Sequence, residues 1–128
     1  METGNKMSEA KHECEAWKRT LEFLFQESTQ LKNRLADNIN LLPAGDIAID
    51  KAEQLHQILM KNDEMLYFLK SDIAVMDRLL LPGKDQKEEP LLDKIGIQQE
   101  NLRNEIKAIG LNFMELQYQL NNYLGVIR

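Results

Sequence analysis

The chain has 128 residues and a net charge of −5, an acidic balance that argues against nucleic acid or an anionic membrane as the main partner. Its single cysteine excludes an internal disulfide framework and fits a reducing compartment. No apolar run approaches the roughly 20 residues that span a bilayer, and Met1 to Glu13 lacks the apolar core of a secretory signal. We therefore predict a cytoplasmic protein that forms one domain over residues 1–128, with no nucleic acid and no membrane among its partners.

The first helix is predicted over about residues 8–41. Ser8 is a suitable N-cap, and Glu9 lies in the first turn, where the helix dipole favours an acid. Pro43 disfavours helical geometry at the residue before it, so the helix should end near Leu41. Residues at alternating spacings of three and four form a seam that is apolar except for one serine and one asparagine. These positions are Ala10, Cys14, Trp17, Leu21, Leu24, Ser28, Leu31, Leu35, Asn38 and Leu42.

The second helix, predicted over about residues 47–81, has the most regular seam. A tight turn at Pro43–Asp46 precedes it, and either Asp46 or Asp50 can cap it. Pro82 ends it. Its seam is apolar at every position but one and consists of Ala48, Ala52, Leu55, Leu59, Asn62, Leu66, Leu69, Ile73, Met76 and Leu80.

The third helix is predicted over about residues 90–125, after a turn at Pro82–Glu89. Pro90 suits the first turn of a helix, and Gly125 marks the expected end. Its seam contains a single polar residue and consists of Leu92, Ile95, Gln99, Leu102, Ile106, Ile109, Phe113, Leu116, Leu120, Tyr123 and Ile127.

Three seams of matched length with short connections predict an all-α fold, an antiparallel up-down-up three-helix bundle with coiled-coil-like heptad packing. The alternative is one long hairpin that dimerises into a four- or six-helix assembly. Folding the first two helices together places Ser28 beside Asn62, with Gly110 at the same level. These residues either form a polar layer that sets the register or lie at the edge of the seam.

No group of residues predicts chemistry. Two Glu-x-x-His units, ending at His12 and His56, have a spacing used in di-iron bundles. The predicted fold separates the two histidines by roughly 30 Å along the bundle, which is too far for a shared metal. Cys14 lies on the seam beside acidic neighbours and is expected to be a small buried hydrophobe. We predict no catalytic residue, no metal site and no cofactor, and a metal- or cofactor-binding bundle is the disfavoured alternative.

More apolar residues are present than the three seams use. Some flank the seams and are expected to widen the core-facing stripe: Phe25, Ile39, Ile58, Met65 and Leu79. Others lie farther from the seams and are the candidate partner-binding residues: Met60, Tyr67, Phe68 and Val75 on the second helix, and Ile97, Leu111 and Tyr118 on the third, with Gly96 and Gly110 beside them. A contiguous exposed patch of such residues would mark a partner site.

These patterns predict a non-enzymatic protein–protein interaction module that binds a protein partner or itself, with a homodimer as one expected form. The alternative is an export-type or helix-binding chaperone. In architecture alone, the predicted bundle looks like flagellar and type III export chaperones. It also looks like single spectrin-type repeats, which share a tryptophan in the first helix, here Trp17. Neither resemblance includes a sequence motif, so neither implies particular site residues.

Overall fold

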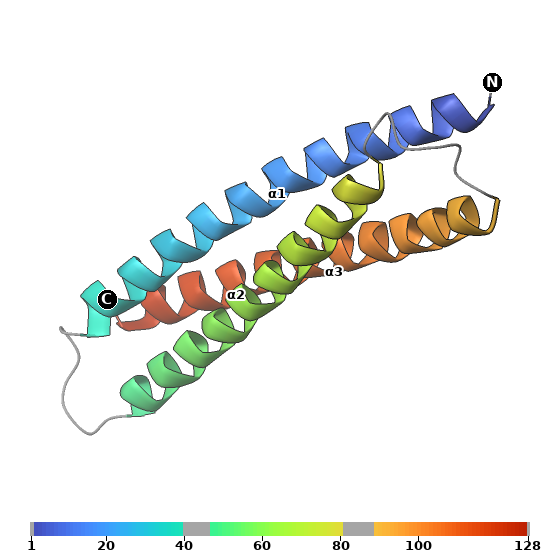
Figure 1. The fold of residues 1–128 in the computed structure, drawn as a ribbon. Coiled ribbons are helices and arrows are strands. Elements are labelled where there is room, and N and C mark those ends of the chain that lie inside the picture. The colour runs from blue at the N-terminus through green and yellow to red at the C-terminus, as the bar shows by residue number, and fades with distance from the viewer. Residues whose placement is uncertain (1, 40–46, 81–88, 128) are drawn as a thin grey trace.

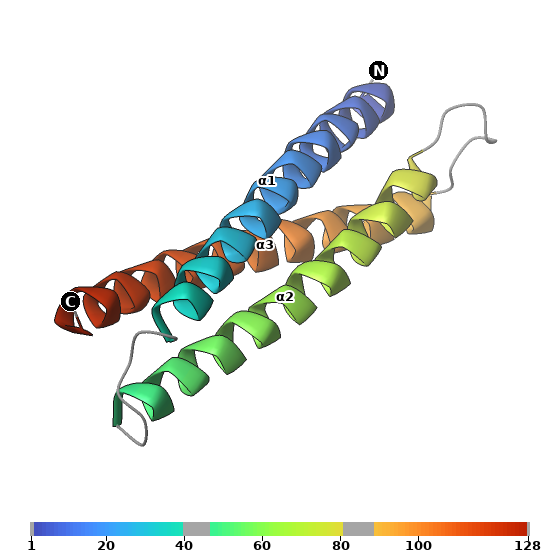
Figure 2. The ribbon, with the colours of Figure 1, turned by 90° about the vertical axis from the view of Figure 1, so that its left-hand side faces the viewer.

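The structure, a computed structural model, describes residues 2–39, 47–80 and 89–127. It contains three helices: α1 (Glu2–Ile39), α2 (Ile47–Leu79) and α3 (Glu89–Ile127). Each helix packs against the other two, and α2 runs antiparallel to α1 and α3 (Figures 1 and 2). No strand occurs in these ranges, so the predicted up-down-up three-helix bundle is confirmed.

The core follows the predicted seams. In the described ranges every buried side chain lies on a seam, with Leu124 as the one exception. Leu59 and Leu66 of α2 and Leu102 of α3 are fully buried, and Trp17 of α1 is 7% exposed. The spacing of three and four therefore places the buried positions of all three helices along the axis of the bundle.

The outer column of α2 is polar, as expected for an amphipathic helix in water. On α2 the residues opposite the seam are exposed at Gln57, Glu64, Ser71 and Arg78. Over the described ranges, no helix combines the length and the apolarity that crossing a bilayer would require.

The helix ends differ from the prediction at the N-terminus. The helix α1 begins at Glu2, so Ser8 lies within the helix and is not its N-cap. The reason is that the apolar seam extends back to Met7, which packs against the core and gives the first turns something to bury. The helix α3 continues through Gly125 to Ile127. The turn predicted at Pro43–Asp46 and most of the turn at Pro82–Glu89 lie outside the described residues.

Candidate partner-binding surface

The boundary between α1 and α2 is bridged by charged side chains. Ser28, which is fully buried, donates a hydrogen bond of 2.6 Å from its Oγ to Oδ1 of Asp63. The other oxygen of this carboxylate accepts a hydrogen bond of 2.5 Å from Nζ of Lys32. Farther along, Nζ of Lys18 lies 2.9 Å from Oδ2 of Asp77. Carboxylates of α2 thus bind side chains of α1 at two positions along the bundle.

The hydrogen-bond partner of Ser28 is not Asn62, although both side chains are buried, as a polar layer at this level requires. Ser28 bonds to Asp63, the next residue of α2, because Asp63 lies on the side of α2 that faces α1. Asn62 is 7% exposed, and its Nδ2 has no hydrogen-bond partner among the described residues. The polar layer therefore contains one satisfied group and one unsatisfied buried amide, which is unusual in a packed core.

The boundary between α1 and α3 is also polar. The guanidinium of Arg103 donates hydrogen bonds of 2.9 and 2.7 Å to the carboxylate of Glu13, and Gln99 donates to the same carboxylate. The hydrogen bond from Arg103 is the main cause that lowers the pKa of Glu13 below its usual value. Near the other end, Arg34 donates to Asn121 at 2.9 Å, which joins the C-terminal parts of α1 and α3.

Among the described residues, the boundary between α2 and α3 lacks such charged bridges. An open groove of about 270 Å³ runs along it, and Ile58 and Met65 form part of its α2 wall. The α3 wall presents the polar side chains of Asn112, Glu115 and Gln119. Among the described residues no ion pair joins α2 to α3. Asn62, with its unpaired amide, also lines this groove.

A second apolar line follows this side of α2. Ile58, Met65 and Leu79 are 45%, 48% and 36% exposed, so the expectation that these three residues widen the core is wrong. Phe68 follows Met65 by three residues, and Val75 follows Asp72 by three residues. Residues at this spacing are neighbours on one face of a helix, so each pair lies on the same side of α2. Phe68 is the most exposed large hydrophobic residue described, at 71%. We name this line the α2 stripe and define it as Ile58, Lys61, Met65, Phe68, Asp72 and Val75.

The other candidate residues on α2 lie elsewhere. Tyr67 faces the α1 side, where its ring packs edge-to-face on Phe25 with ring centroids 5.0 Å apart. Met60 precedes Tyr67 by one heptad and shares its column. The four candidate residues predicted on this helix therefore divide, with Met60 and Tyr67 towards α1 and Phe68 and Val75 towards α3.

The candidate residues on α3 form a single outward column. Ile97, Leu111 and Tyr118 are exposed, but Asn104 interrupts the column between Ile97 and Leu111. A Cβ added at Gly96 or Gly110 would meet no atom within 4 Å, so neither glycine serves a close helix contact within the described chain.

Sequence reasoning missed two exposed hydrophobic residues, Met114 of α3 and Phe23 of α1. It also assigned Ile58 and Met65 to the core. From Ile58 onward, a second set of residues follows at alternating spacings of three and four beside the seam. Recognising this second set in the sequence would have identified the α2 stripe.

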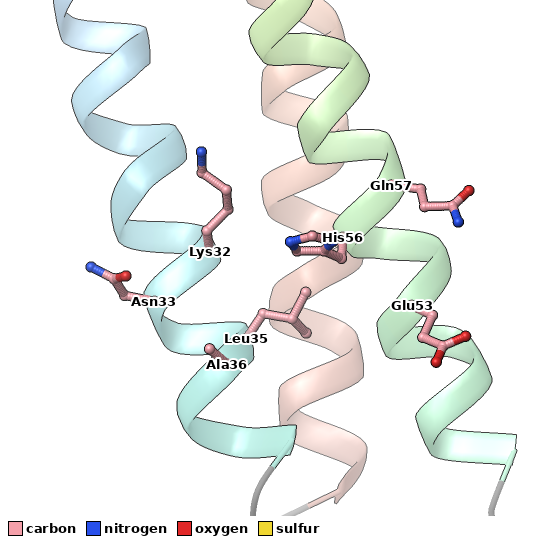
Figure 3. Close-up of a pocket in the computed structure, with 7 residues that line it drawn as sticks. All are labelled: Lys32, Asn33, Leu35, Ala36, Glu53, His56 and Gln57. Carbon is pink, nitrogen blue, oxygen red and sulfur yellow. The ribbon is translucent and has the colours of Figure 1, made fainter.

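The depressions between α1 and α2 do not assemble a reactive group. Figure 3 shows one of about 500 Å³, in which Leu35 and His56 point between the helices while Glu53 and Gln57 point away. The Glu53 and His56 side chains of the second Glu-x-x-His unit therefore diverge. In the described ranges, no three histidine, cysteine or acidic side chains lie close enough to hold a metal ion.

Cys14 is a buried free thiol in the core of the bundle. Burial is the main cause that raises its pKa to about 11, and the negative charge of Asp77 adds to the shift. Because only the thiolate is a strong nucleophile, the thiol is unreactive near neutral pH.

Comparison with protein-family models, with curated proteins and with solved structures finds no match to this chain.

Proposed function

We propose that this protein is a non-enzymatic interaction module that binds a protein through the uncovered side of α2. The observation that carries the proposal is the α2 stripe, in which four large apolar side chains are between 45% and 71% exposed. The cytoplasm is the compartment proposed for this activity, because the chain has a single cysteine, which is buried.

The regular spacing of the α2 stripe supports this function. Single exposed hydrophobic residues are common on soluble proteins and need no partner. Here four apolar residues, together with the charged Lys61 and Asp72, follow one another at spacings of three and four over about five turns, which is the pattern of a helix that packs against another helix. The outer column of the same helix is polar at Gln57, Glu64 and Ser71, so the apolar line is confined to one side.

A helix-binding chaperone is the second candidate function, and the open groove between α2 and α3 favours it. Ile58 and Met65 form part of the groove's α2 wall. A client helix in the groove would cover both apolar side chains. The α3 wall, with Asn112 and Gln119, offers hydrogen-bonding groups.

Three lysine substitutions test the function. Phe68→Lys places a charge on the α2 stripe, Leu111→Lys places one on the outward column of α3, and Glu64→Lys is the control on the polar column. Each residue is exposed, so the monomer should remain folded by circular dichroism. Sedimentation at increasing concentration measures self-association, and quantitative co-purification with the tagged chain measures foreign partners.

We expect Phe68→Lys to abolish association while Glu64→Lys leaves it unchanged, because an unpaired charge in an apolar contact is costly. Loss with Leu111→Lys alone would move the binding surface to α3. A wild-type chain that neither self-associates nor recovers any partner in a manner sensitive to these substitutions would overturn the proposed function.

A further inference from the structure

We infer that a second copy of this chain covers the α2 stripe, with the two α2 helices antiparallel about a two-fold axis that passes between Leu66 and Tyr67. The inference rests on the proposed function and names the partner. The basis of the inference is that two copies of the α2 stripe, placed side by side in opposite directions, bring complementary residues together. In a two-fold interface each residue meets a residue of the same surface on the other copy, so self-complementarity is the property required.

The apolar residues of the stripe pair across this axis. Residues equally distant from the axis lie opposite each other, which places Met65 opposite Phe68 of the other copy and Ile58 opposite Val75. Each pair occurs twice by symmetry, giving four apolar layers. These four side chains are exposed within one copy, so the contact would remove a large apolar surface from water.

The charged residues of the stripe pair in the same register. Lys61 and Asp72 are also equally distant from the axis, so each lysine meets the aspartate of the other copy. Neither makes an ion pair within the described chain. Because they are eleven residues apart on one helix, about 16 Å, they do not reach each other within one copy.

The same charges reject the parallel arrangement. Two parallel α2 helices in register would place Lys61 beside Lys61 and Asp72 beside Asp72, and like charges at a helix contact are unfavourable. A charged residue on an otherwise apolar seam thus selects the direction and register of pairing, at some cost in stability.

The other exposed apolar surface is less suited to this contact. A helix contact requires two adjacent columns that alternate at three and four. On α3, Met114 joins Leu111 and Tyr118 at these spacings, but Asn104 separates this group from Ile97, so the apolar part of the two columns extends only from Leu111 to Tyr118. The longer described surface, from Ile58 to Val75, is the α2 stripe. Because it extends over about 26 Å of one helix, the contact is small, and we expect a dissociation constant in the micromolar range or weaker.

The test exchanges the two charges separately. A chain with Lys61→Asp carries two acids on the stripe, and a chain with Asp72→Lys carries two lysines. Each substitution turns two attractive contacts of the homodimer into repulsive ones. We expect each variant to self-associate roughly tenfold more weakly than wild type, on the scale of exposed ion pairs. An equimolar mixture of the two restores both attractive contacts, and its association should return to near the wild-type level.

Sedimentation equilibrium of the wild type, each variant and the mixture gives the dissociation constants, with Glu64→Lys as the charge control outside the stripe. A substitution can also act within one copy, as when Lys61→Asp introduces repulsion with nearby Glu115. Such effects are the same in the pure and mixed samples, so they cannot restore association on mixing. Circular dichroism confirms that each variant is folded.

Recovery on mixing supports the antiparallel dimer. A wild-type dimer whose strength is insensitive to both substitutions would overturn the pairing. A wild-type monomer at the highest attainable concentration would also overturn it. In that case the proposed function survives if a foreign partner is recovered in a manner sensitive to Phe68→Lys. The two failures are therefore distinguishable.

Discussion

The two boundaries of α2 are built differently. On the α1 side, Asp63 and Asp77 each bind groups of α1. On the α3 side, the corresponding flank carries Ile58 and Met65, both nearly half exposed, and no ion pair crosses to α3 among the described residues. One helix thus presents a charged flank to one neighbour and an apolar flank beside the other.

The difference shows which surface the monomer leaves incomplete. A carboxylate such as Asp63, which satisfies Ser28 and Lys32, completes its hydrogen bonds within the chain. An apolar flank in contact with water is energetically unfavourable until another surface covers it. The α1 side of α2 thus contributes to stability within the chain, and the α3 side is the surface that we propose for external binding.

The largest loss of stability is expected from substitutions in the core, which lies beneath both boundaries of α2. Leu66→Ala and Ile106→Ala should each lower the free energy of unfolding by about 2–5 kcal/mol, because both residues are buried and each leaves a cavity. Glu64→Ala, at an exposed site, should change it by less than about 0.5 kcal/mol. Urea denaturation measures all three, and equal midpoints would refute the assignment of the core.

The next largest loss of stability is expected to differ between the two boundaries of α2. Asp63→Ala should cost about 1–3 kcal/mol, because it leaves the buried hydroxyl of Ser28 without its acceptor. Asn112→Ala is the matched change on the α3 side and should cost less than about 0.5 kcal/mol, since the side chain is exposed and makes no hydrogen bond to the described residues. Comparable losses in urea denaturation would remove the distinction between the boundaries.

The two buried polar residues should respond in opposite directions. Ser28→Ala should cost about 1 kcal/mol through loss of its hydrogen bond to Asp63. Asn62→Leu replaces an unsatisfied amide with an apolar side chain of similar size and should raise stability by up to about 1 kcal/mol. Thermal denaturation of both variants tests this contrast. Destabilisation by Asn62→Leu would indicate that the amide has a partner in solution.

The smallest expected change in stability comes from the boundary between α1 and α3, and this change depends on pH. The pKa of Glu13 is lowered from 4.5, chiefly by the hydrogen bond from Arg103. Its contribution to stability is therefore present above the unfolded pKa and is lost as the pH falls through the lower folded pKa. Between neutral and acidic pH, wild type should lose slightly more stability than Glu13→Gln, by less than the effect of Asp63→Ala, because the pair is largely exposed. Parallel stability profiles for the two proteins would contradict this.

The sequence by itself determined the core of this protein. The period of the seam is a local property, because residues three and four apart share a helix face wherever that helix lies. Leu55, Leu69 and Ile109 are buried for this reason, and the three-helix fold follows from three such seams of matched length. The start of α1 was misplaced because Ser8 resembles a cap, although Met7 continues the seam.

The tertiary structure alone decided which flank of α2 meets which neighbour. A three-helix bundle can be built with either hand from the same seams, and the hand determines whether Asp63 or Met65 faces α1. In this structure Asp63 faces α1, so Ser28 is satisfied, Asn62 is not, and Met65 lies at an open groove. The core pattern contains no information about that choice, because both hands bury the same seam residues. The flanking residues distinguish the two hands only once three helices are placed together.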